Sequence, residues 1–261
     1  MFSTSAIAGV PRRDRHLILA CIALICTLAW VYLVHLGRQM SSEMEHTNMM
    51  AAMGMAMNTP WSAADIFFTF AMWVVMMIGM MAPAATPVIL LFAAAQAKRS
   101  ERAAPLTTAL FGLGYISVWV GFSAAASIVQ WALHQASLLS AAMSASSPRF
   151  AGAILVTAGT YQFTRWKSNC LTHCRSPLGF LMTHWHDGKL GAFHMGVRHG
   201  IYCIGCCWAL MGLLFVLGVM NLAWVATLGA LVLLEKAGPQ GTWVARVCGG
   251  ALIVWGIAVI V

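Results

Sequence analysis

Long apolar runs separated by short polar stretches make up most of this chain. Seven of these runs approach or exceed the roughly 20 apolar residues that a helix needs to cross a bilayer. They lie at residues 17–36, 66–95, 106–133, 150–166, 200–219, 222–235 and 243–261. The pattern predicts an all-α fold: a polytopic transmembrane helical bundle of about seven spans, forming a single integral membrane domain over residues 1–261.

Two features of the runs leave an alternative open. The second run is long and contains Pro83 and Pro87, which we expect to kink the helix or to end its regular part. The fourth and sixth runs are short. Six spans plus one re-entrant segment is therefore the alternative to seven spans.

Composition and charge fit a membrane protein. Of the 261 residues, 61% are hydrophobic and only 8% are charged, against about 25% charged residues in soluble domains. The formal net charge is +8, but the basic residues stand at the ends of apolar runs and form no patch or stripe. We therefore expect the lipid bilayer, and no nucleic acid, as a partner.

The basic residues also predict the orientation of the chain. If seven spans alternate from a cytoplasmic N-terminus, every Lys and Arg except Arg38 and Arg149 falls on the cytoplasmic side. The opposite orientation would invert this bias and break the positive-inside rule. We expect a multi-pass protein with its N-terminus in the cytoplasm and its C-terminus outside it.

Five cysteines stand in two groups beside the fourth and fifth runs. Cys170 and Cys174 have the spacing of one helix face, as do Cys203, Cys206 and Cys207. The predicted orientation places both groups at the cytoplasmic side, where thiols are normally kept reduced, so metal binding is favoured over disulfides. Convergent thiolates suit zinc or an iron-sulfur cluster, or Cu(I) at lower coordination.

Histidines accompany the cysteines, one within the first group and the others between the two groups, so residues 167–200 are predicted to form a Cys/His-rich cytoplasmic loop. The candidate nitrogen ligands are His173, His184, His186 and His199. Two other interpretations remain open: the cysteines could be small packing residues in membrane helices, or a redox dithiol. Glu235 and Lys236 close the sixth run, where we expect the acid to snorkel or to pair with the lysine.

Methionines form a row on the second run. Met72, Met76 and Met80 recur on one helix face, with Met77 and Met81 beside them. Thioether sulfur is a soft ligand that suits Cu(I), so the row is a candidate metal path. Core packing by flexible side chains is the alternative.

A second group of methionines falls between the first two runs, in a predicted Met-rich outer loop at residues 37–65. The candidates for outer metal capture are Met49, Met50, Met53, Met55, Met57 and His46. An amphipathic segment lying on the membrane is the other interpretation.

Four strings together resemble a known family. They are MWVVMMIGMMAP from Met72, YQFTRWKSNCLTHCRSP from Tyr161, GIYCIGCCWALM from Gly200, and Glu235-Lys236. Over roughly residues 61–240 the chain is similar to the bacterial domain of unknown function 2182 family, described as predicted metal-binding integral membrane proteins. The resemblance implies a bacterial inner-membrane location and a metal function carried by Cys170, Cys174, Cys203, Cys206 and Cys207, with Met72, Met76 and Met80 as weaker candidates.

The leading hypothesis is an inner-membrane protein that binds a soft metal, copper favoured and zinc next, at the cytoplasmic Cys/His site and moves it across the membrane. A metallochaperone or a membrane complex is the expected protein partner. The alternatives are a non-enzymatic assembly subunit with a structural zinc and a membrane thiol oxidoreductase. We predict no enzyme, because the sequence shows no paired carboxylates and no nucleophile with a base.

Overall fold

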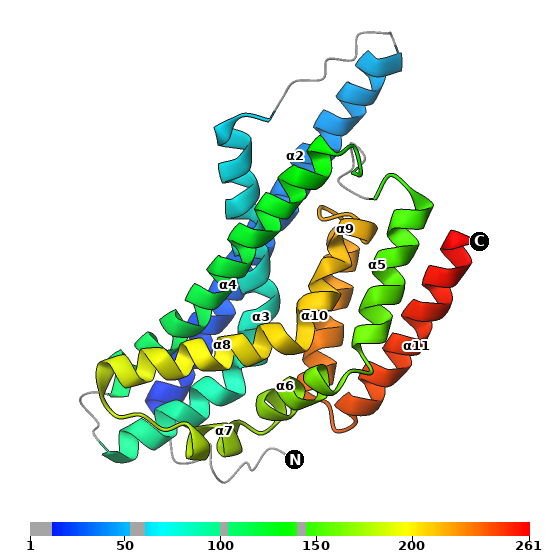
Figure 1. The fold of residues 1–261 in the computed structure, drawn as a ribbon. Coiled ribbons are helices and arrows are strands. Elements are labelled where there is room, and N and C mark those ends of the chain that lie inside the picture. Colours follow the sequence, from blue (N-terminus) through cyan, green and yellow to red (C-terminus); the bar gives the residue numbers. More distant parts are fainter. Residues whose placement is uncertain (1–11, 53–60, 100–103, 140–144) are drawn as a thin grey trace.

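A computed structural model describes residues 12–52, 61–99, 104–139 and 145–261, and these residues form helices and no strand (Figure 1). The helices are α2 (Arg12–Ala52), α3 (Ala63–Arg99), α4 (Ala104–Gln135), α5 (Pro148–Tyr161), α6 (Arg165–Arg175), α7 (Pro177–Thr183), α8 (Gly188–Gly212), α9 (Leu214–Leu217), α10 (Leu222–Ala237) and α11 (Gly241–Ile260). The prediction of an all-α helical bundle is confirmed.

Five segments of the described chain are long and apolar enough to cross a membrane. They are Arg12–Met40, Ala63–Arg99, Ala104–Gln135, Gly188–Leu217 and Gly241–Ile260. The fourth and sixth predicted spans form α5 and α10, of 14 and 16 residues. At 1.5 Å per residue these helices reach only about 21 and 24 Å, which is less than the roughly 30 Å of a hydrocarbon core. The protein is thus a membrane protein with five full-length candidate spans in its described part, and α5 and α10 are shorter helices in place of the other two predicted spans.

Several predicted boundaries differ from the structure. α3 continues as a helix through Pro83 and Pro87 and does not end there. The predicted outer loop at 37–65 is helical as far as Ala52, and α3 already begins at Ala63. The predicted loop at 167–200 consists of α6, α7 and the first half of α8. Propensity for helix therefore extends well past the apolar runs from which the spans were predicted.

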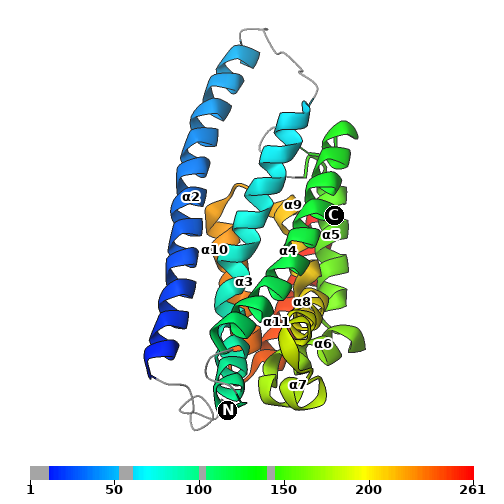
Figure 2. The same cartoon turned by 90° about the vertical axis from the view of Figure 1, so that its left-hand side faces the viewer.

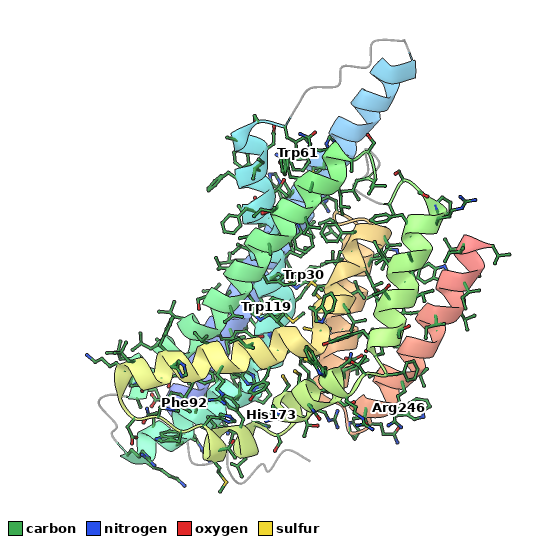
Figure 3. The ribbon with its side chains drawn as sticks, in the orientation of Figure 1. Trp30, Trp61, Phe92, Trp119, His173 and Arg246 are labelled. Atoms are coloured by element: carbon green, nitrogen blue, oxygen red, sulfur yellow. The ribbon has the colours of Figure 1, made fainter. Side chains whose placement is uncertain are left out.

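The helices alternate in direction, so their ends gather at two ends of the bundle. One of them, here called the α6–α7 end, contains the start of α2, the end of α3, the end of α10 and the start of α11 (Figure 1). Figure 3 places His173 and Arg246 at this end and Trp119 nearer the middle of the bundle. The segments predicted to be cytoplasmic therefore share one end of the bundle.

α8 crosses the bundle obliquely and contacts both α4 and α6, while α5 pairs with α11 (Figures 1 and 2). The α4–α8 contact depends on Gly114 and Gly196. A Cβ added at either position would collide with a backbone carbonyl of the facing helix, that of Phe193 or of Phe111. Small residues of this kind allow membrane helices to approach closely. The close approach fixes α8 in the centre, where its cysteines face α6.

Candidate metal centre

The two groups of cysteines meet between α6 and α8. The Sγ atoms of Cys174 and Cys206, 32 residues apart in the sequence, lie 3.8 Å from each other. Cys203 and Cys207 are buried beside Cys206, whereas Cys170 and Cys174 are half-buried. We call these five residues the thiol cluster. All eight cysteines of the chain are free thiols.

Local sequence explains why α6 presents its cysteines to α8. Thr164 caps the start of α6 by accepting a hydrogen bond from the backbone N–H of Lys167, at 3.3 Å. The helix ends at Arg175, before Pro177. Gly205 on α8 leaves room for Cys170, because an added Cβ would lie 2.6 Å from the Cys170 Sγ.

Within α8 the buried thiols donate hydrogen bonds to the backbone. The Sγ of Cys206 donates to the carbonyl of Cys203 at 3.1 Å, and the Sγ of Cys207 donates to the same carbonyl at 2.9 Å. The third cysteine of this group, Cys203, makes its side-chain contacts with other helices. A metal bound by Cys206 and Cys207 would replace these hydrogen bonds.

Cys203 has two polar partners that the sequence analysis missed. The Nζ of Lys236 donates to its Sγ at 2.8 Å. The hydroxyl of Tyr115 donates to the carbonyl of Met81 at 3.2 Å, and its oxygen lies 3.1 Å from the same sulfur. α4, α8 and α10 therefore converge on one sulfur atom. The signal that could have revealed Lys236 was its position at the end of an apolar run, next to an acid.

The expected pair of Glu235 and Lys236 does not form. Glu235 pairs with Lys167 instead. The Nζ of Lys167 donates to Oε2 of Glu235 at 2.7 Å, and both side chains are only 1% exposed. Arg175 donates to the backbone carbonyls of Glu235, at 2.6 Å, and of Pro239, at 3.1 Å. Neighbouring residues on a helix point in different directions, so Glu235 and Lys236 reach different partners. Together these bonds fasten α6, which bears Cys170 and Cys174, to the end of α10.

Two of the four candidate histidines, His173 and His184, lie near each other beside Tyr202 of α8. His173 stacks on Tyr202, with ring centroids 4.3 Å apart and an interplanar angle of 6°. Its Nδ1 lies 2.9 Å from the carbonyl of Asn169. The His184 ring lies 6.1 Å from that of His173. Partial burial lowers the pKa of His184, which favours the neutral imidazole that can ligate a metal.

The other two candidate histidines have different surroundings. His199 is buried, its Nδ1 has no hydrogen-bond partner, and its ring packs against Phe180 at 5.1 Å and Tyr115 at 5.8 Å. His186 is exposed beside His194, with ring centroids 5.7 Å apart. The structure therefore separates His186 from the interior and leaves His199 inside it.

The outer thiols retain their protons more strongly than an ordinary cysteine. Burial raises the pKa of Cys170, and the nearby sulfur of Cys206 adds to the effect. Interactions with the sulfurs of Cys203 and Cys206, followed by burial, raise the pKa of Cys174. Metal binding must therefore release protons from these thiols.

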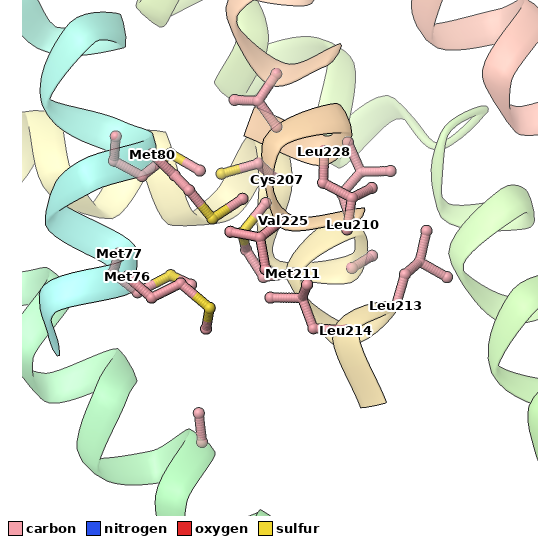
Figure 4. Packing of buried hydrophobic residues seen from close by; sticks show 14 of the residues in the cluster. Met76, Met77, Met80, Cys207, Leu210, Met211, Leu213, Leu214, Val225 and Leu228 are labelled. Atoms are coloured by element: carbon pink, nitrogen blue, oxygen red, sulfur yellow. The ribbon is translucent and has the colours of Figure 1, made fainter. Parts of the chain in front are cut away.

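The methionine row of α3 packs into the same core as the inner thiols. Met72, Met76, Met77, Met80 and Met81 are all buried, in one cluster that includes Cys203, Cys206, Cys207 and Met211. In Figure 4 the labelled methionines of α3 point toward Cys207 and Met211. Met211 was not among the predicted residues. A sulfur-rich core thus continues from the thiol cluster into the bundle.

The side chains of most candidates for outer metal capture lie outside the part of the chain that the structure describes. Met49 is exposed on α2. Met53, Met55 and Met57 lie outside the described residues, and so do the side chains of His46 and Met50. The capture hypothesis therefore stays a prediction.

The arrangement of the donor atoms limits how many ligands the site offers to a metal ion without side-chain rotation. Within the described residues, no group of three or more Cys, His, Asp or Glu side chains is placed to hold a metal ion. The Cys174–Cys206 separation of 3.8 Å is within the span of two metal–sulfur bonds of about 2.3 Å each. Binding by two thiols fits this geometry, whereas a third or fourth ligand requires side-chain rotation.

Comparison with known proteins identifies the family. The sequence profile of PpoB2, described as a copper chaperone, matches residues 70–259, that is 190 of the 261 residues. No curated protein and no solved structure matches the chain. The matched region contains the whole thiol cluster and the methionine row of α3, but not residues 37–65. A metal-related family is confirmed, under the PpoB2 name and not as domain of unknown function 2182. The chain belongs to the PpoB2 copper-chaperone family.

Proposed function

We propose that this protein is a membrane-embedded copper chaperone that holds Cu(I) in the thiol cluster between α6 and α8. The observation that carries the proposal is the meeting of Cys174 and Cys206, two sulfurs from different helices at 3.8 Å. Membership of a copper-chaperone family supports copper as the cargo. The proposed activity is binding and transfer of the ion and includes no catalysed reaction.

The chemistry of the donors favours Cu(I) over other ions. Thiolate and thioether ligands are soft and select Cu(I), and the thiol cluster shares its core with the methionines of α3. Zinc, the second choice, binds thiolates well but has no preference for thioethers. A zinc site would not require thioethers beside the thiols, so their presence in one core favours Cu(I).

Transfer through the membrane is the further part of the proposal. Thioethers of α3 would pass the ion from the opposite end of the bundle toward the tighter thiols near the α6–α7 end. Weak sites followed by stronger ones allow movement without trapping the ion midway. We place the α6–α7 end in the cytoplasm of a bacterium because its segments contain most of the basic residues. There a metallochaperone or a membrane complex would take the ion from the side of the thiol cluster near His173.

The rival function is a structural zinc clamp in an assembly subunit. The observation in its favour is that the thiol cluster joins two helices, as a structural zinc site does. Such a clamp would bind zinc with four ligands and would not exchange it with a partner. The experiment below separates the two functions by the ion bound.

The test is metal binding to the purified full-length protein in lipid nanodiscs. Cu(I) affinity would be measured without oxygen, by competition with a chromophoric Cu(I) chelator. The Cys174→Ser and Cys206→Ser double variant should bind Cu(I) about a hundredfold more weakly or worse. This expectation is conservative, since losing a residue that only orients a ligand already lowers metal affinity roughly 10- to 100-fold.

The matched control is the Cys21→Ser and Cys26→Ser double variant, which removes two thiols from α2. It should bind Cu(I) as the native protein does. Equal Cu(I) affinity of both double variants would refute the proposed site. Purification of the native protein with one equivalent of zinc that Cu(I) cannot displace would establish the structural clamp instead.

A further inference from the structure

The buried carboxylates next to the thiol cluster do not neutralise both buried lysines there. Lys167 and Glu235 neutralise each other in an ion pair that is 1% exposed on both sides. Lys236 is 6% exposed, and no carboxylate in the described part of the chain lies within ion-pair distance of it. The partner of its ammonium is the sulfur of Cys203, at 2.8 Å.

A buried ammonium requires an anionic partner, and in membrane helices such groups pair with one another or line a functional site. Lys236 is directed at the sulfur of Cys203, whereas Cys206 and Cys207 donate to the backbone carbonyl of Cys203. The hydroxyl of Tyr115 approaches the same sulfur at 3.1 Å. Lys236 therefore adds one fixed positive charge to whatever complex the thiols form.

Charge balance then limits the cargo. Two thiolates and a monovalent ion form a complex with one negative charge, which the ammonium of Lys236 cancels. Two thiolates and a divalent ion are neutral, and the ammonium would leave an unbalanced positive charge in a low-dielectric interior. A divalent ion would need a third thiolate to reach neutrality, and zinc would need a fourth ligand as well.

Geometry agrees with the two-thiolate solution. The sulfur of Cys174 lies 3.8 Å from that of Cys206, and Cys203 lies about one helical turn before Cys206 on α8. Side-chain rotation can therefore bring the thiolate of Cys203 and one from Cys174 or Cys206 onto one ion, without movement of α6 or α8. The ammonium at 2.8 Å from Cys203 lies close enough to act on such a complex directly.

We propose that Lys236 is a specificity-determining residue that makes the thiol cluster select a monovalent soft ion, bound by two thiolates with Cys203 as one of them. This inference rests on the proposed function and deepens it, since it assigns the charge and the coordination number of the cargo. Lys236 touches a ligand and not the ion, so it acts through Cys203.

The first test is X-ray absorption spectroscopy of the native protein loaded with one equivalent of Cu(I). Two sulfur ligands per copper are expected. Three or four sulfurs would overturn the inference, because it assigns two-coordinate binding. This measurement needs no variant and so does not depend on the folding of one.

The second test is the ratio of Cu(I) to Zn(II) affinity in three variants. Lys236→Met should lower Cu(I) affinity roughly 10- to 100-fold and raise Zn(II) affinity, so that the preference for Cu(I) narrows. Lys236→Arg keeps the charge and should keep the preference. Lys189→Met removes an exposed lysine of α8 and should change neither affinity, which controls for net charge.

The outcomes separate this inference from the proposed function. If the native protein binds no Cu(I), the proposed function fails. If it binds Cu(I) and Lys236→Met preserves the native ratio of affinities, the inference fails while the function stands. A monodisperse Lys236→Met protein with native helix content would show that the variant folds. If that variant does not fold, the ratio in Lys236→Arg and the sulfur count of the native protein decide.

Discussion

The thiol cluster and the methionine row of α3 are neighbours in one buried core, but they are held in place by different forces. The thiols are tied to polar groups: Cys203 to Lys236 and Tyr115, and Cys206 to Cys174. Thioethers are weak hydrogen-bond acceptors. Within the described residues, the side chains of Met76, Met77 and Met80 are held by apolar packing. The thiols are therefore positioned as ligands would be, whereas burial of the methionines fits both a path and a plain core.

This difference has a practical consequence. Polar interactions are directional, so removing one partner from the thiol side should leave a buried group unsatisfied and have a large effect. Flexible methionines tolerate replacement by hydrophobic residues of similar volume. Stability measurements should thus respond strongly near the thiol cluster and weakly along α3, while copper measurements can distinguish packing from transfer.

The largest effect is expected where α6 is fastened to α10. Lys167→Met would leave Glu235 as an unpaired buried carboxylate, and breaking such a pair from one side destabilises by about 3–5 kcal/mol. Reversible unfolding in mixed micelles, followed by tryptophan fluorescence, would measure the change. Loss of Cu(I) affinity should accompany it, because α6 contains Cys170 and Cys174.

The control is the double variant Lys167→Met and Glu235→Leu, which removes both charges. Replacing a buried ion pair by hydrophobic residues is often neutral or stabilising, so the double variant should recover most of the lost stability. A double variant as unstable as Lys167→Met would mean that the pair itself, and not the stranded carboxylate, stabilises the contact between α6 and α10.

A smaller effect on stability is expected along α3. Met76→Leu together with Met80→Leu conserves volume and should change the free energy of unfolding by less than about 1.5 kcal/mol. If the row is a path for Cu(I), cells expressing the variant should deliver copper more slowly, while the affinity of the thiol cluster stays unchanged. Met211→Leu, on α8 in the same core, tests whether the path includes the residue that the sequence did not suggest.

Unchanged copper delivery in the Met76 and Met80 variant would assign the row to packing. The proposed thiol site would still stand, because its cysteines are positioned by polar contacts that do not involve the side chains of the methionine row. Matched expression levels, measured by immunoblotting of membranes, are needed so that delivery is compared per molecule. The thiol cluster would then bind copper, and the methionine row would only pack the core.

Hydrophobic periodicity and spacing predicted much of the fold and part of the site. Each of the seven apolar runs forms a helix, including the short ones that became α5 and α10. The i, i+4 spacing of Cys170 and Cys174 placed both on α6. These features are local, since they depend on helix geometry and on the length of apolar segments.

Tertiary partners could not be predicted in the same way. Glu235 and Lys236 are adjacent in the sequence, but residues i and i+1 of a helix do not face each other, and they reach Lys167 and Cys203 instead. Tyr115 lies 88 residues from Cys203 and carries no local mark of its role. Such contacts follow from the crossing of α4 and α8, which depends on the close approach at Gly114 and Gly196.

The smallest effect is expected at Tyr115, where a single atom can be removed. Tyr115→Phe deletes the hydroxyl that lies 3.1 Å from Cys203 and donates to the carbonyl of Met81, and preserves the ring packed against Trp119 and His199. Loss of one such hydrogen bond is worth about 1 kcal/mol. Cu(I) affinity should fall by roughly fivefold, the equivalent of that free energy.

Ser127→Ala is a suitable control for Tyr115→Phe. It deletes another buried hydroxyl of α4, one that donates to the carbonyl of Ala124 within its own helix. It should alter stability by a similar small amount and leave Cu(I) affinity unchanged. If both variants lowered affinity equally, the effect would come from the loosening of α4 and not from the hydroxyl at Cys203. A loss confined to Tyr115→Phe would instead show that polar contacts from α4 help to set the ligand, which is the property that separates the thiol cluster from the methionine row.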